Sequence, residues 1–296
     1  MPPGEETVAE RLQLRLAELT PAERKVVRAL MADYPVRGLE PVARLAAAAG
    51  VSPPTVLRLA GKLGFDSYAD FQQSLKAEVA ARLSSPLELH AERAEPPGDA
   101  LARAERMLCG GISASFARLP RAEFEQAVRL LADSRYAITL IGGRFSSMLA
   151  EYLAAQLRIL RPRVHVVSSA GADRMSSMLD IGRADVLVAF DYRRYQHDTV
   201  RLALQGKDQG ATLIACTDPY LSPLAARADV ILTSSVASPS PFDALTPALA
   251  LVEALIAAIV DRLGDAPLAR MARYDALSEG TVDAADVGSY ELGEDL

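Results

Sequence analysis

From Tyr136 onward, short apolar runs alternate with helical segments, and this alternation restricts the possible fold more than any other feature of the chain. The apolar runs are Ala137–Ile141, Val164–Val167, Val186–Phe190, Thr212–Cys216 and Val230–Leu232. Each run is long enough for one buried strand. The alternation therefore predicts an α/β fold with a doubly wound parallel sheet, in which ligands bind at the carboxyl ends of the strands.

The first unit of this pattern, Ala137–Leu160, has the order of a strand, a glycine turn and an amphipathic helix. Gly142 and Gly143 let the backbone turn sharply and approach a ligand closely. Ser146 and Ser147 open the helix, where N–H groups and the positive end of the helix dipole favour an anion. The unit predicts one wall of a phosphate or carboxylate pocket, and it does not indicate whether that pocket catalyses or senses.

The bulk composition excludes several classes of protein. The 296 residues fit one large domain or two ordinary ones, and no apolar run reaches the ~18 residues of a membrane span. Residues 1–12 do not resemble a signal peptide, so we expect a cytoplasmic protein with reduced thiols. Cys109 and Cys216 are far apart, and with three scattered His they predict no metal site. We expect no cofactor either.

The net charge of −6 does not argue against DNA binding, because the charge is uneven. Residues 1–80 contain ten Lys and Arg and ten Asp and Glu, so all of the excess negative charge lies in the rest of the chain. A neutral small domain with locally placed arginines is compatible with a nucleic-acid partner.

The N-terminal part has the layout of a helix-turn-helix. Thr20-Pro21-Ala22-Glu23 is a strong helix start with a capping box. Further on, the predicted helices Val42–Ala49 and Pro53–Leu63 are separated by a short turn that contains Gly50. The second helix would enter the major groove, and its candidate DNA-binding side chains are Ser52, Thr55, Arg58 and Lys62. An ordinary helical hairpin with a solvated basic face is the alternative.

The residues around this turn carry a longer pattern, formed by Leu45-Ala46, Gly50-Val51-Ser52, Thr55-Val56, Arg58, Lys62-Leu63-Gly64-Phe65, Tyr68 and Phe71. This pattern resembles the RpiR family of bacterial transcription regulators, in which LAxxxGVSxxTVxRxxxKLGFxxYxxF precedes a sugar isomerase (SIS) domain. The resemblance to the SIS domain covers roughly residues 127–263. We expect Phe65, Tyr68 and Phe71 to pack a further helix, Tyr68–Leu83, against the motif.

The expected organisation has four parts. Residues 1–83 form an all-α helix-turn-helix domain, and residues 84–99, with their prolines and charges, form a linker. Residues 100–276 form the SIS domain for effector binding and oligomerisation. Residues 277–296 are an acidic tail.

The resemblance implies hydroxyl groups that hold a sugar phosphate after the strands. Ser146 and Ser147 fit the first such loop, and Ser168 and Ser169 fit the second. The third loop departs from the family's Ser-x-Ser-Gly-x-Thr run: Asp191 stands near its first serine, Arg193 and Arg194 replace the small residues, and Thr199 keeps the last position. Two arginines favour an anion, whereas Asp191 would repel a dianion unless it is paired. Salt bridges across a subunit interface are the alternative role for the arginines.

The leading hypothesis is therefore a DNA-binding regulator that is not an enzyme. Its SIS domain would sense a small anionic metabolite, such as a sugar phosphate or a related carbohydrate derivative. Double-stranded operator DNA, the effector and further copies of the chain in a homodimer or homotetramer would be the partners. A sugar-phosphate isomerase or lyase with an accessory helical domain is the alternative, with His197 and Asp198 as the candidate bases. A ligand-responsive protein-binding module is a third possibility.

We expect His165 to be a core residue of its strand.

Overall fold

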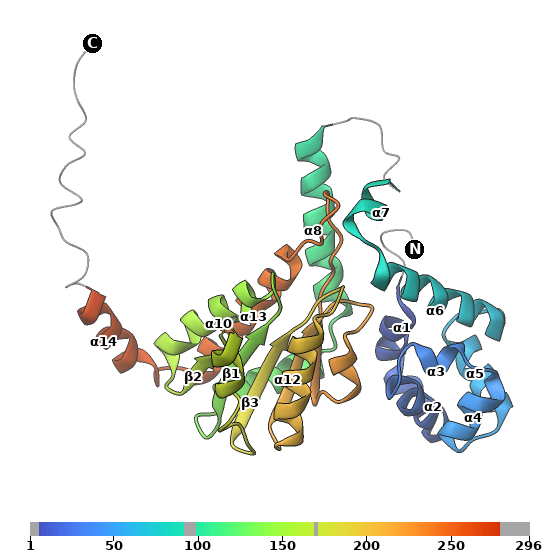
Figure 1. Cartoon of the computed structure of the whole chain (residues 1–296), viewed down its shortest axis with the longest axis horizontal. Helices are drawn as coiled ribbons and strands as arrows, with labels where there is room; N and C mark the ends of the chain where they lie inside the picture. Colours follow the sequence, from blue (N-terminus) through green and yellow to red (C-terminus); the bar gives the residue numbers. More distant parts are fainter. Residues whose placement is uncertain (1–5, 92–98, 169–170, 279–296) are drawn as a thin grey trace, which may run out of the picture.

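The computed structural model describes residues 6–91, 99–168 and 171–278, and it begins with a cluster of helices that lies to one side of the sheet (Figure 1). The six helices that form this cluster are α1 (Val8–Leu14), α2 (Pro21–Met31), α3 (Val36–Leu39), α4 (Val42–Ala49), α5 (Pro53–Lys62) and α6 (Tyr68–Leu83). One apolar core joins them, with fully buried Leu30, Leu45 and Leu75. The amphipathic patterns of the sequence produce this core because each helix buries a single face.

Local signals set the boundaries of these helices as predicted. Thr20 and Glu23 form the capping box at the start of α2, with each side chain bonded to the other residue's backbone N–H. Gly50 ends α4 with φ 63°, a left-handed conformation that glycine adopts without steric cost. Phe71 stacks on Tyr68 and meets Phe65 edge to face, so the three aromatic residues hold α6 against the cluster.

The second part of the chain is a sheet of five parallel strands in the order β2-β1-β3-β4-β5. The strands are β1 (Ala137–Gly142), β2 (Val164–Val166), β3 (Asp185–Phe190), β4 (Thr212–Thr217) and β5 (Val230–Thr233), each close to its predicted run. The chain leaves β1 toward β2 on one side and later adds β3 on the other. The carboxyl ends of β1 and β3 thus form a topological switch point, where doubly wound sheets bind ligands.

Helices cover both faces of this sheet. They are α8 (Ala100–Arg118), α9 (Arg121–Ala132), α10 (Ser147–Leu160), α12 (His197–Asp208) and α13 (Thr246–Leu263). Ile138 and Leu140 point from β1 into one core with α9, α10 and α13, whereas Ile141 points into a second core with α12. This alternation along β1 is the two-residue period of a strand with both faces buried.

Three segments differ from the expectations. A six-residue helix, α7 (Pro86–Ala91), lies inside the predicted linker, and α14 (Leu268–Ser278) extends past residue 276, so only residues 279–296 of the predicted tail lie outside the described residues. The expectation that His165 is a core residue is wrong, because His165 is exposed. It lies on the edge strand β2, and the short helix α11 (Gly171–Ser176) follows that strand.

In the described ranges, no helix is both long enough and apolar enough to cross a membrane.

Candidate functional site

Helices α4 and α5 meet at the turn Gly50–Ser52 and present one side of α5 to solvent. The N–H of Val51 donates to the carbonyl of Ala46 at 3.0 Å, which fixes the angle at which the chain leaves α4. Val56, Leu59 and Ala60 anchor α5 in the apolar core. Because these three residues face inward, Ser52, Leu57, Arg58 and Lys62 are left on the outer side.

A short chain of hydrogen bonds orders the polar residues of α5. The hydroxyl groups of Ser52 and Thr55 lie 3.1 Å apart, and the Arg58 guanidinium donates to Thr55 Oγ1 at 3.1 Å. Thr55 itself is only 6% exposed, so its hydroxyl holds Arg58 in place more than it reaches outward. Leu57, an apolar residue that would be expected in the core of the motif, is instead 47% exposed beside Arg58.

Lys62 lies at the end of α5 and is engaged within the protein. Its Nζ atom lies 2.8 Å from the carboxylate of Glu23, which is 3% exposed and also forms the capping box of α2. Lys62 therefore ties α5 to α2. Its side chain remains 44% exposed, so part of its positive charge still acts at the surface.

At the sheet, the glycine turn after β1 is shaped by close backbone contacts. A Cβ atom on Gly142 would lie 2.5 Å from the Cα and the backbone nitrogen of Ser147, so only glycine fits there. Ser146 Oγ accepts from the N–H of Gly143 at 2.9 Å and donates to the carbonyl of Phe190 at 2.7 Å. Ser146 is 6% exposed, and its hydroxyl joins the end of β1 to the end of β3.

Thr199 is also buried, and it pairs with an arginine that the sequence analysis did not select. Arg174, on α11, donates to the carbonyl of Gly142 at 3.2 Å and to Thr199 Oγ1 at 2.7 Å. Arg174 is 8% exposed, and Asp198 lies 3.6 Å from its Nε atom. The only sequence signal for Arg174 is its place just after the second strand, in a polar stretch that follows Ser168 and Ser169.

The loop between β3 and α12, residues 191–196, begins with a buried carboxylate. Asp191 accepts from Ser222 Oγ at 2.5 Å and from the N–H of Gln196 at 3.1 Å. Burial raises the pKa of Asp191 to about 6, although these hydrogen bonds oppose the shift. The repulsion of a dianion that the sequence suggested is thus weakened, because the carboxylate is turned into the protein.

A second buried carboxylate, Asp218, follows β4. It accepts from the hydroxyl of Tyr195 and the N–H of Tyr220, both at 2.9 Å. Its Oδ2 atom is buried without a hydrogen-bond partner among the described residues, and burial raises the pKa of Asp218 to about 6. The loops after β3 and β4 therefore each begin with a carboxyl group whose pKa is raised, which is a common feature of functional sites.

The paired arginines contact Asp243 of the same chain. Arg193 forms a two-point ion pair with Asp243, and Arg194 lies 3.8 Å from the same carboxylate. Arg193 also donates to the carbonyl of Ala81 at 3.1 Å, on the last turn of α6. Arg194 is the more exposed of the two, at 37% of its side chain, and has a positive φ of 67°. The salt bridges foreseen for these arginines thus form within one chain.

The remaining predicted residues differ in burial and in position. Ser147 and Ser168 are half-buried, and Ser169 lies outside the described residues. The structure therefore gathers Gly142, Gly143, Ser146, Thr199 and Asp191 around the switch point, whereas Arg193 and Arg194 turn toward Asp243. His197 and Asp198 are exposed at the start of α12.

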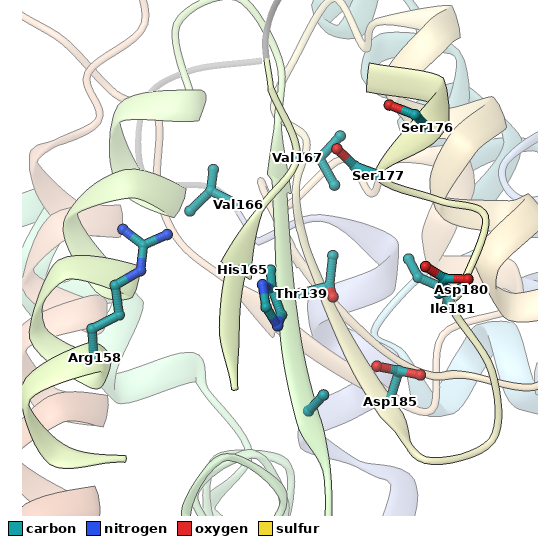
Figure 2. A pocket seen from close by; sticks show the side chains of 11 residues that line it. Thr139, Arg158, His165, Val166, Val167, Ser176, Ser177, Asp180, Ile181 and Asp185 are labelled. Carbon is teal, nitrogen blue, oxygen red and sulfur yellow. The ribbon is translucent and has the colours of Figure 1, made fainter. Parts of the chain in front are cut away.

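A separate hollow of about 490 Å³ lies beside the edge strand and away from these loops (Figure 2). Arg158 of α10 stands on one side of it, and Asp180 and Asp185 stand on the other, with His165 and Thr139 on the strands between them. Among the residues that the structure describes, none of the predicted effector-binding residues lines this hollow.

Two family models match the chain. The family model described as the helix-turn-helix domain of the rpiR family matches residues 6–82, and the model of the SIS domain matches residues 130–258. The chain belongs to the RpiR family. Like other members of this family, it joins a helix-turn-helix to a sugar isomerase fold.

Several known proteins are similar to this RpiR protein in sequence or in fold. The transcriptional regulator HexR of Pseudomonas aeruginosa is 27% identical over 75% of this chain and 77% of HexR. The sugar isomerase domain of an RpiR transcription factor from Sphaerobacter thermophilus has a TM-score of 0.56 and 22% identity, covering 60% of this chain and 98% of that one. The Vibrio vulnificus NanR protein, solved in complex with ManNAc-6P, has a TM-score of 0.53 and 16% identity, covering 93% of this chain and 99% of NanR.

Proposed function

We propose that this protein is a transcription regulator that binds operator DNA through α5 and senses a small anionic metabolite at the carboxyl ends of β1 and β3. The metabolite is a sugar phosphate or a related carbohydrate derivative. The observation that carries the proposal is a direct contact between the two parts: Arg193 of the β3–α12 loop donates to Ala81 on α6 of the helical cluster. A ligand that moves this loop can thereby change the placement of the helix-turn-helix.

The outer side of α5 supports the DNA-binding half of the proposal. Ser52, Leu57 and Arg58 are the residues of α5 that would meet base edges in the major groove. Thr55 positions Arg58, and Lys62 combines its structural ion pair with an attraction to phosphate. The exposed Arg58 and the partly exposed Lys62 on this surface favour a partner with negative charge, and so a DNA-binding regulator over a protein-binding module.

The glycine turn and its surroundings support the effector half. Glycine-rich turns between a strand and a helix bring backbone N–H groups close to anions. The buried Arg174 supplies positive charge at this turn, next to Gly142 and Thr199. The NanR protein, which shares the fold, was solved in complex with ManNAc-6P, which agrees with a phosphosugar class of effector.

An isomerase or lyase role is less well supported. Such a reaction needs a base held close to the substrate. His197 and Asp198 are both exposed, and Asp198 lies 3.6 Å from the Arg174 guanidinium, which engages its carboxylate in an ion pair. We therefore propose that the SIS domain binds its ligand without turnover.

The working assembly would be a homodimer or homotetramer in the cytoplasm, because helix-turn-helix heads read palindromic half-sites in pairs. We also propose the domain division given above: a DNA-binding domain over residues 1–83, a linker over residues 84–99, and an SIS domain over residues 100–276. The separate cores of the helical cluster and of the sheet support this division.

Fluorescence anisotropy with the intergenic DNA upstream of the protein's own gene tests the function. We expect saturable binding that changes when a panel of sugar phosphates, amino-sugar phosphates and organic acids is added. Each compound of the panel is also assayed for turnover by the same protein. Absence of binding to that DNA, or ketose–aldose exchange that His197→Ala abolishes, would reject the proposal in favour of the enzyme.

A further inference from the structure

The backbone of the glycine turn already holds an oxygen atom of the protein itself. The N–H of Arg144 donates to the side-chain Oε1 atom of Gln196 at 2.5 Å. A Cβ atom on Gly143 would lie only 2.6 Å from the same oxygen, so the amide of Gln196 rests directly against the turn. Gln196 lies at the N-cap of α12, 52 residues further along the chain than Arg144.

The surroundings of this oxygen favour a more negative group than an amide. A backbone N–H donor accepts any oxygen that has a free lone pair, and an anionic oxygen forms the stronger hydrogen bond. Arg174 is buried at the adjacent Gly142, and its Nε atom has no hydrogen-bond partner among the described residues, with Asp198 3.6 Å away. The turn therefore has a backbone donor at Arg144 and a buried cation, Arg174, bonded to the carbonyl of Gly142 two residues earlier.

We propose that Gln196 is a built-in competitor of the effector. Its side-chain oxygen holds the position of a phosphate or carboxylate oxygen of the ligand, and the effector must displace it in order to bind. This inference rests on the proposed function, because it assigns the atom that the effector replaces at the same site. It also makes Gln196 a determinant of affinity that the hydroxyl pattern of the family does not indicate.

Displacement of the Gln196 side chain would affect the helical cluster through a few direct contacts. Two residues of the same loop contact the last turns of α6: Arg193 donates to Ala81, and Arg82 stacks over the ring of Tyr195 with its guanidinium carbon 5.1 Å from the centroid. The N–H of Gln196 is in turn fixed by Asp191. Because Gln196 follows Tyr195 directly, rotation of Gln196 away from the turn disturbs the contacts that hold α6.

Isothermal titration of the full chain with inorganic phosphate tests the competition. We expect Gln196→Ala to bind phosphate about three- to tenfold more tightly than the wild type, since one competing hydrogen bond is removed. Gln196→Glu should bind roughly tenfold or more weakly, because its carboxylate keeps the position and repels the anion. Gln205→Ala, the same change on the exposed side of α12, should leave the affinity unchanged.

Operator titrations of the same variants, without phosphate, test the route to α6. We expect Gln196→Ala to shift the operator affinity in the direction in which saturating effector shifts the wild type, and Gln205→Ala to leave it unchanged. Unchanged or weaker phosphate binding by Gln196→Ala, or its failure to bind phosphate at all, would overturn the competition. If Gln196→Ala binds the operator with the same affinity as the ligand-free wild type, the proposed coupling from Gln196 to α6 is wrong. The proposed function survives these results if wild-type operator binding still responds to the metabolite panel, and it fails on its own if the panel has no effect.

Discussion

The helix α5 and the loop between β3 and α12 use arginine in opposite ways. On α5, Arg58 is exposed, and its partner Thr55 lies three residues away on the same helix. In the loop, Arg193 is nearly buried and bonds to Ala81, 112 residues earlier, and to Asp243, 50 residues later. The first arrangement leaves a cation facing solvent, whereas the second joins two parts of the protein.

This difference separates a surface that binds a large partner from a site that responds to a small one. A DNA-binding face needs only exposed donors on a rigid helix, because the partner supplies the opposite charge. A sensing site needs groups whose hydrogen bonds can be exchanged, so its polar residues are engaged with one another before the ligand arrives. The following predictions test this contrast, from the largest expected effect to the smallest.

The strand-end site should be far less tolerant of an added methyl group than an open loop. Gly142→Ala places a Cβ atom 2.5 Å from the Ser147 backbone, which no side-chain rotation relieves. We expect the free energy of unfolding of the sheet domain to fall by about 2–4 kcal/mol, measured by guanidinium denaturation. Gly182→Ala, with no atom within 4 Å of the new Cβ atom, is the control and should change stability by less than about 0.5 kcal/mol. Equal stability of the two variants would contradict the tight turn.

The α5 surface should lose function without losing stability. Arg58→Ala removes an exposed cation whose guanidinium donates to Thr55 of the same helix. We expect operator affinity to fall about ten- to a hundredfold, by anisotropy at fixed salt, with an unchanged melting temperature. Arg129→Ala on α9, where the arginine is 51% exposed, serves as the matched loss of charge and should bind DNA like the wild type. If both variants bind equally well, α5 is not the recognition helix.

The junction between the helical cluster and the sheet should respond to pH. Glu78 of α6 is fully buried, accepts from the N–H of Val8 and from the hydroxyl of Tyr34, and burial raises its pKa to about 7. Glu10 raises this pKa further, and Arg82 opposes the shift. Because Glu78 then binds more protons in the folded state than in the unfolded state, its contribution to stability is fully present at low pH and is lost as pH rises through 7.

We expect about 2 kcal/mol of stability to be lost from this group between pH 5 and pH 8, as measured by urea denaturation at each pH. Glu78→Gln should flatten this decline, whereas Glu105→Gln on the exposed side of α8 should not. A wild-type stability that rises over this range would show that Glu78 is charged throughout.

The smallest effect concerns Lys62 of α5, whose side chain forms an ion pair within the protein and is also partly exposed to solvent. Lys62→Ala leaves the buried Glu23 without its cation, and we expect a loss of about 1 kcal/mol in stability, reduced by solvent because Lys62 is 44% exposed. Operator affinity should fall less than in Arg58→Ala. Lys25→Ala, an exposed lysine on α2, is the control in thermal unfolding and should melt like the wild type.

Much of the fold follows from short-range patterns. The capping box at Thr20, the left-handed Gly50 and the strand β1 each lie where the sequence places them, because their causes lie within a few neighbouring residues. The family pattern from Leu45 to Phe71 likewise predicted the helix-turn-helix and the packing of α6. His165 was misplaced because β2 is the edge strand of the sheet and His165 borders a hollow there, and the apolar neighbours of His165 contain no information about strand order.

The sequence by itself determined the order of the elements and the glycine turn, since local hydrogen bonding and side-chain periodicity decide them. Only the tertiary structure decided which groups meet at the switch point. It brought Gln196 to the N–H of Arg144, Arg174 to Thr199, and Asp243 to the two arginines. These pairs join residues that are far apart along the chain, so their contacts exist only after the sheet and its loops have closed.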